Sequence, residues 1–130
     1  MNRRVLAIDD EPYILATYER TLRAFTLETA TDANTALTML NSRPPFAVVI
    51  SDMRMPGMDG IELLAKCKEL HPDSVRIMIS GNTDFDSAVE AVNEDSLFRI
   101  LPKPCHPKIL AKVVEEAVRQ YQLVTSNANY

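Results

Sequence analysis

The chain has 130 residues, the size of one domain, and its composition of 46% hydrophobic and 25% charged residues is typical of a globular protein. The formal net charge of −4 argues against a general nucleic-acid-binding surface, which needs a basic patch. No apolar run approaches the length of a membrane span, so we expect a single domain that contacts neither nucleic acid directly nor a membrane.

The first third of the chain alternates apolar runs with segments of helical spacing. Residues 5–8 predict a short strand, and apolar residues that recur at helical spacing predict a helix over 13–25. Residues 27–30 predict a weak strand. Asp32 is a good N-cap for a helix over 33–40.

The strongest strand signal lies in the middle of the chain, at residues 46–52. This run of small or β-branched apolar side chains has no polar alternation until it ends in Asp52, which is typical of a strand buried on both faces. Residues 53–60 are dense in Pro, Gly and Asp and predict a loop. A helix over 61–70 and a strand over 75–79 follow.

The last third repeats the alternation. Weakly apolar residues around 88–92 predict a short helix, and residues 98–101 predict a fifth strand. The final helix carries an apolar stripe that consists of Ile109, Leu110, Val113, Val114, Ala117, Val118 and Tyr121. Residues 126–130 form a polar tail.

Strict alternation of strands and helices predicts one parallel sheet with helices on both faces and right-handed crossovers. The fold class is therefore α/β. The two cysteines, Cys67 and Cys105, form no CxxC pattern, and the N-terminus has no signal-peptide features. We expect free thiols and a cytoplasmic location.

Polar side chains follow four of the predicted strands and would meet at the carboxyl edge of a parallel sheet. They are Asp9 and Asp10 after the first strand, Asp52 at the end of the third, Ser80 after the fourth and Lys103 after the fifth. Carboxylates that lie ~4 Å apart repel by about 4 kcal/mol at an effective dielectric constant near 20. A cation would relieve this repulsion, and ligands that are all oxygen suit Mg²⁺ better than Zn²⁺.

A metal beside a carboxylate, a lysine and a hydroxyl is suited to a phosphoryl group. The metal and Lys103 would neutralise the phosphoryl oxygens, and Ser80 could donate a hydrogen bond to one of them. An aspartate such as Asp52 can itself be the nucleophile and form an acyl phosphate. The residue types at this edge therefore predict phosphoryl chemistry.

The motifs Asp9-Asp10, residues 52–60, Ser80 and Lys103-Pro104 stand in the order and spacing of a known family. Over residues 4–122 the chain resembles the receiver domain of bacterial two-component response regulators, in the CheY-like superfamily. The resemblance implies a flavodoxin-like, doubly wound, five-stranded parallel sheet in the order 2-1-3-4-5 with five helices. It places a receiver domain at 1–125, followed by the tail at 126–130.

The resemblance also implies a role for each motif residue. Asp52 would accept a phosphoryl group from a histidine kinase, from a phosphotransfer protein or from a small donor such as acetyl phosphate. Lys103 would pair with the phosphoryl oxygens, and Ser80 would turn toward them.

For the metal, the resemblance implies direct coordination of Mg²⁺ by Asp10, Asp52 and the main-chain carbonyl of Arg54. Asp9 would act mainly through water. A receiver assists its own phosphorylation and dephosphorylation but is not an enzyme with a separate substrate.

One departure concerns the position three residues before Lys103, where the family usually has an aromatic side chain that swings inward on activation. Here that residue is Ile100, so the chain departs from the family pattern at the aromatic part of the switch. Strand alternation predicts that Phe98 lies on the same face of the sheet as Ile100. Receivers often pair through the fourth helix, fifth strand and fifth helix, and Val89 and Val92 could serve such a homodimer. An output domain or partner protein would receive the signal.

Three alternatives remain at this stage. An aspartate-nucleophile phosphohydrolase usually has a second acid two residues after the nucleophile, where this chain has Arg54. A flavin-binding module would need a phosphate-cradling loop after the first strand, where this chain has Asp9, Asp10 and Glu11. A receiver could also be a constitutive protein-binding platform for which phosphorylation is unimportant.

Overall fold

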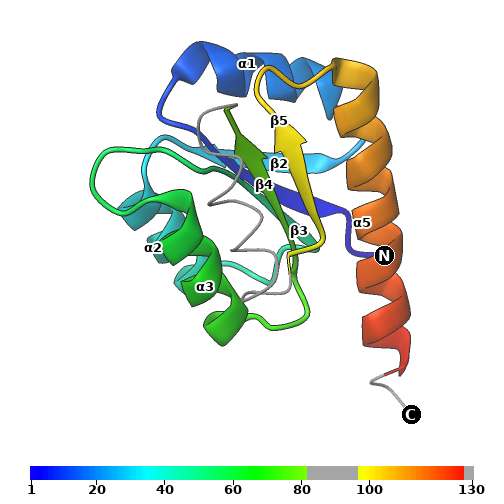
Figure 1. The fold of residues 1–130 in the computed structure, drawn as a ribbon. Coiled ribbons are helices and arrows are strands. Elements are labelled where there is room, and N and C mark those ends of the chain that lie inside the picture. Colours follow the sequence, from blue (N-terminus) through cyan, green and yellow to red (C-terminus); the bar gives the residue numbers. More distant parts are fainter. Residues whose placement is uncertain (82–96, 128–130) are drawn as a thin grey trace.

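The computed structural model describes residues 1–81 and 97–127 (Figure 1). Its centre is a sheet of five strands in the order β2-β1-β3-β4-β5, with every neighbouring pair parallel. The strands are β1 (Arg4–Ile8), β2 (Thr26–Ala30), β3 (Val48–Asp52), β4 (Val75–Ser80) and β5 (Arg99–Pro102). The strand order and direction expected from the sequence are confirmed.

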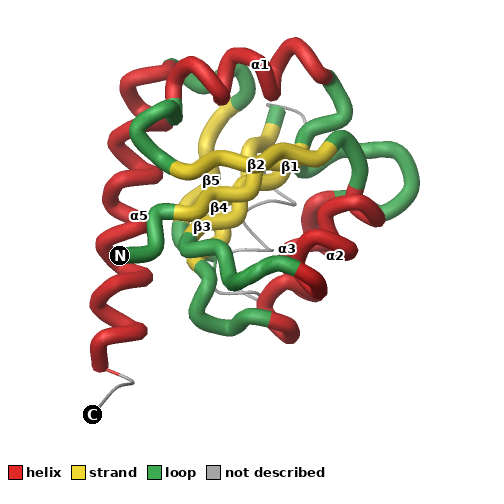
Figure 2. Tube along the Cα trace, turned by 180° about the vertical axis from the view of Figure 1, so that it is seen from behind, coloured by secondary structure: helices red, strands yellow, loops and turns green. Residues whose placement is uncertain are grey.

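Helices cover both faces of this sheet (Figures 1 and 2). The described helices are α1 (Pro12–Thr21), α2 (Ala33–Ser42), α3 (Gly60–Leu70) and α5 (Pro107–Asn127). They account for four of the five expected helices, and the one predicted around residues 88–92 lies outside the described residues. None of these four combines the length and the apolar character that a bilayer crossing needs.

The core consists of two apolar layers, one on each face of the sheet. Side chains alternate along a strand, so Leu6 and Ile8 of β1 face α2 and α3, whereas Val5 and Ala7 face α1 and α5. β3 and β4, which lie in the middle of the sheet, are buried along their whole length. The continuous apolar run before Asp52 thus has its expected cause, which is burial on both sides.

Aspartate side chains cap two of the helices, at the predicted Asp32 and at Asp59, which is not among the predicted caps. The carboxylate of Asp32 accepts a hydrogen bond from the Thr35 N–H (2.7 Å) at the start of α2. Asp59 caps α3 in the same way through the Glu62 N–H (2.9 Å). These bonds satisfy N–H groups that have no partner inside the helix.

Helix α1 is shorter than predicted, because it ends at Thr21 rather than at residue 25. The Phe25 N–H donates to the Leu22 carbonyl (2.9 Å), which closes a turn, and the Thr26 N–H then joins the Arg3 carbonyl at the start of β2. Leu22 is fully buried, and Phe25 packs against the same apolar layer. A turn therefore brings both side chains to the core. In the sequence, the spacing of Leu22 and Phe25 is the same as in a helix.

The predicted common face of Phe98 and Ile100 is wrong. Ile100 packs in the layer below α2 and α3, whereas Phe98 packs with α1 and α5. The reason is that β5 begins only at Arg99, so strand alternation does not extend back to Phe98.

The apolar stripe of α5 is correct except at its first residue. Ile109 is 52% exposed, whereas Leu110, Val114 and Val118 are buried. A helix turns by about 100° per residue, so Ile109 falls outside a stripe that is centred on Leu110. Helix α5 also runs through Ser126 and Asn127, the first two residues of the predicted tail, and 128–130 lie outside the described residues.

Candidate functional site

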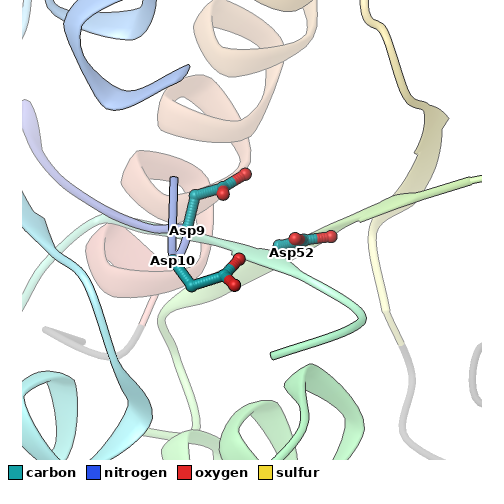
Figure 3. Close-up of side chains that lie close together, drawn as sticks. All are labelled: Asp9, Asp10 and Asp52. Atoms are coloured by element: carbon teal, nitrogen blue, oxygen red, sulfur yellow. The ribbon is translucent and has the colours of Figure 1, made fainter. Parts of the chain in front are cut away.

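The carboxyl edge of the sheet brings together side chains from three strand ends. Asp9 and Asp10 follow β1, Asp52 is the last residue of β3, and Lys103 follows β5. Figure 3 shows the three carboxyl groups of this cluster side by side. One carboxylate oxygen of each lies within 4.8 Å of the others. This is the juxtaposition that parallel strand order predicts for residues far apart in sequence.

The Lys103 ammonium joins two of these carboxylates. Its Nζ donates to Oδ2 of Asp52 (2.9 Å) and to Oδ2 of Asp9 (3.1 Å). Burial alone would lower the pKa of Lys103, but the hydrogen bonds to Asp52 and Asp9 and their negative charges outweigh it, so its pKa is raised. The lysine therefore stays protonated at neutral pH and places a fixed positive charge beside Asp52. The Lys103–Pro104 peptide bond is cis.

The acidic cluster has the donor set of a hard divalent cation. Asp9 is 1% exposed and both of its oxygens are engaged, one by Lys103 and the other by the Glu11 N–H (2.9 Å). Asp52 is 6% exposed, and Asp10 is exposed to solvent. Oxygen donors with access to water fit Mg²⁺, which keeps several of its own water molecules. The residues present therefore fit this ion.

The buried carboxyl of Asp9 makes the stability of the fold depend on pH. Burial is the main cause that raises its pKa above the ordinary value of 3.8, against the lowering effects of the Glu11 N–H and of Lys103. A raised carboxyl pKa favours the folded state at low pH, and this contribution is lost as pH rises through the folded-state pKa.

Asp9→Asn is therefore expected to raise the free energy of unfolding at pH 7, because the neutral amide avoids the burial of a charged carboxylate. The gain should disappear below pH 3.8, where the carboxyl is protonated in both states. Urea unfolding across this pH range measures it. Asp32→Asn is the contrast, because hydrogen bonds from Thr35 lower the pKa of Asp32 and its charged form stabilises the fold. Equal pH dependence of the two variants would contradict the prediction.

Ser80 lies at the same edge, but its hydroxyl bonds to neither Asp52 nor Lys103. Its Oγ is 3.5 Å from Sδ of Met53 and 3.2 Å from the Gly81 carbonyl oxygen, and it can donate to either. The Lys103 N–H donates to the Ser80 carbonyl (2.9 Å), so the backbone of the two residues is joined. Nothing in the sequence indicates that a methionine would accept a hydrogen bond from Ser80.

The loop after Asp52 closes tightly on the end of β3. The Gly60 N–H donates to the Met53 carbonyl (2.9 Å), and a Cβ at Gly60 would lie only 2.2 Å from the Asp52 carbonyl oxygen. Only glycine fits there without a shift of the backbone. The only sign of this role in the sequence is a glycine directly before the helix predicted over 61–70. Arg54 lies in this loop with an exposed side chain.

Comparisons with known proteins agree on one family. The family model for the response regulator receiver domain matches residues 5–115. The hydrogenase transcriptional regulatory protein HoxA of Cupriavidus necator is 38% identical over 115 residues, which cover 88% of this chain and 24% of HoxA. The DNA-binding transcriptional regulator NtrC of Salmonella typhimurium is 38% identical over 120 residues, which cover 91% of this chain and 25% of NtrC.

A solved structure resembles this chain over almost all of its length. It is described as adenylate cyclase from Rhodopirellula baltica, with a TM-score of 0.96 and 39% sequence identity, and the match covers 99% of this chain and 96% of that one. The chain thus spans about a quarter of the length of the curated relatives it matches, whereas it matches this solved chain nearly end to end.

Proposed function

The chain belongs to the family of response regulator receiver domains, and from this premise we propose that Asp52 is the phosphoacceptor of a phosphorylation-dependent signalling switch. One observation carries the proposal. Asp52 ends a central strand, beside the protonated Lys103 and two further carboxylates. This arrangement supplies an oxygen nucleophile, a fixed cation and ligands for a metal in one place.

The metal would be held by Asp10, Asp52 and the main-chain carbonyl of Arg54. Asp9, whose two oxygens already accept from Lys103 and Glu11, would act through water. When bound, Mg²⁺ neutralises oxygens of the phosphoryl group. The protein residues would keep the donor of that group beside the carboxylate of Asp52.

Lys103 and Ser80 would act on the phosphoryl group after its transfer. An acyl phosphate on Asp52 places oxygens close to the Lys103 ammonium, which now lies 2.9 Å from the carboxylate. The Ser80 hydroxyl could then donate to a phosphoryl oxygen in place of its present acceptors. The added charge, close to two negative charges, would drive this repacking.

The phosphodonor would be a histidine kinase, a phosphotransfer protein or a small acyl phosphate, and the free thiols of Cys67 and Cys105 support a cytoplasmic setting. The curated relatives are much longer than this chain and their names describe transcriptional regulators, which supports an output domain or partner as the receiver of the signal. A homodimer through the fourth helix, β5 and α5 remains a proposal, because Val89 and Val92 lie outside the described residues.

The test is incubation of the protein with acetyl phosphate and Mg²⁺, followed by intact mass measurement. We expect a gain of about 80 Da, one phosphoryl group. Chelation of the metal before acetyl phosphate is added should abolish the gain, because the crowded carboxylates then lack the cation that offsets their charge. A gain that is the same with and without chelator would contradict the metal role. Steady release of phosphate from phosphomonoesters would favour the phosphohydrolase instead.

A further inference from the structure

We propose that the thioether of Met53 holds the hydroxyl of Ser80 in its resting position and thereby sets how readily the switch responds to a phosphoryl group. The inference rests on the proposed function, since it concerns the group that would respond at the same site. Its basis is the contact between Ser80 Oγ and Met53 Sδ, which lie 3.5 Å apart. Both residues are buried, with 2% of each exposed.

Backbone hydrogen bonds hold both residues, which favours a response through their side chains. The Met53 N–H donates to the Ile79 carbonyl (2.9 Å), and the Met53 carbonyl accepts from Gly60. The Ser80 carbonyl accepts from the Lys103 N–H (2.9 Å). Rotation of the Ser80 side chain is therefore the movement that this geometry leaves for a response at the end of β4.

The Ser80 hydroxyl has a single proton to donate. In the resting protein it is shared between Met53 Sδ and the Gly81 carbonyl oxygen, which lies 3.2 Å from Oγ. A phosphoryl oxygen on Asp52 must draw the proton away from these acceptors. Met53 directly follows Asp52 in the chain, so the resting hydrogen bond joins Ser80 to the residue next to the phosphoacceptor.

A thioether suits this task because it is a weak acceptor. Loss of the bond leaves a polarisable but apolar sulfur in an apolar layer, where it packs without a donor. A carbonyl or carboxylate in its place would hold the hydroxyl more strongly and would be left as a buried, unsatisfied group on release. Met53 is thus a positioning residue that favours one rotamer of Ser80 in the resting protein, through a hydrogen bond weak enough to be replaced.

The experiment is a double-mutant cycle that combines Met53→Leu with Ser80→Ala. Leucine keeps the volume of the side chain and removes the acceptor, so the fold should be retained. The probe is beryllofluoride with Mg²⁺, a phosphoryl mimic, and its affinity is measured by titration calorimetry. We expect Met53→Leu to tighten binding about threefold where Ser80 is present, the effect of one weak hydrogen bond, and to leave binding unchanged in the Ser80→Ala background.

Met78→Leu is the matched control. Met78 is fully buried in the same apolar layer as Met53 and lies two residues before Ser80, and its thioether makes no hydrogen bond within the described residues. It should leave the affinity unchanged in both backgrounds. If Met53→Leu changed the affinity equally with and without Ser80, the substitution would act through packing alone, and the inference would be overturned.

A second measurement needs no phosphoryl group. NMR couplings between Hα and Hβ of Ser80 report its rotamer in the resting protein. Met53→Leu should broaden the rotamer population, and Met78→Leu should not. An unchanged rotamer in Met53→Leu overturns the inference even if phosphorylation is normal. Conversely, a wild-type protein that acetyl phosphate does not modify would overturn the proposed function and leave this rotamer result to stand by itself.

Discussion

Replacement of Asp52 by Asn is expected to abolish the gain of about 80 Da that acetyl phosphate and Mg²⁺ give the wild-type protein. An amide is a poor nucleophile and carries no charge, so it cannot attack phosphorus and offers the cation only a neutral oxygen. The change is close to isosteric, and Lys103 keeps its contact with Asp9 (3.1 Å). Loss of modification would therefore reflect chemistry at residue 52, and an unchanged circular dichroism spectrum would show that the fold is intact.

Asp73→Asn is the control for this prediction. Asp73 is an exposed carboxylate in the turn before β4, outside the acidic cluster. It should gain the same mass as the wild type at a similar rate. If the Asp52 variant were modified as readily as the Asp73 variant, the phosphoacceptor would be another residue and the proposed mechanism would fail.

Gly60→Ala is expected to cost roughly 3 kcal/mol of unfolding free energy, near the upper end for a single substitution. The added Cβ would meet the Asp52 carbonyl oxygen at 2.2 Å and the Cα of Met53 at 3.0 Å. Both are backbone atoms, so the end of β3 must move, and the carboxylate of Asp52 moves with it. Urea unfolding measures the loss, and the rate of modification by acetyl phosphate should fall as well.

Gly81→Ala is the matched substitution at the same edge of the sheet. A Cβ there meets no atom of the described residues within 4 Å, so the free energy of unfolding should change by no more than about 0.5 kcal/mol. The comparison separates a steric effect from the general consequence of replacing a glycine. Equal stability of the two variants would mean that the loop after β3 can relax away from Asp52.

Phosphorylation and the output of the switch are supported by different observations. The proposed phosphorylation of Asp52 is supported by membership of the receiver family and by the cluster of Asp9, Asp10, Asp52 and Lys103. The match to about a quarter of HoxA and NtrC concerns what lies downstream, and their names describe transcriptional regulators. The names of these longer relatives therefore bear only on the proposed output, whereas phosphorylation can be tested on these 130 residues.

The sequence was sufficient to predict the sheet and the group of residues at its edge. Apolar runs that end in Asp9, Asp52 and Lys103 predict strands, and a parallel sheet gathers the ends of its strands on one side whatever the details of packing. The predicted cap at Asp32 depends only on neighbouring residues, and local chemistry of this kind is visible in sequence.

Other features depended on where a segment stops. The pattern that predicted a helix up to residue 25 is also satisfied by a turn that buries Leu22 and Phe25. Phe98 lies on the opposite face from Ile100 because β5 begins one residue after it. Periodicity indicates which apolar side chains share a face of an element, but the end of the element is set by hydrogen bonds to other parts of the chain.

Only the tertiary structure decided the contacts between distant residues. The pairing of Ser80 with Met53 joins positions that are 27 residues apart, and the fit of Gly60 against the Asp52 carbonyl depends on ångström-scale closure of a loop. The strand pattern places such residues in one region but does not determine which atoms touch, because tight packing is set by the whole fold at once. For this protein, the sequence by itself determined which groups meet at the sheet edge, and the three-dimensional packing decided how they hold one another.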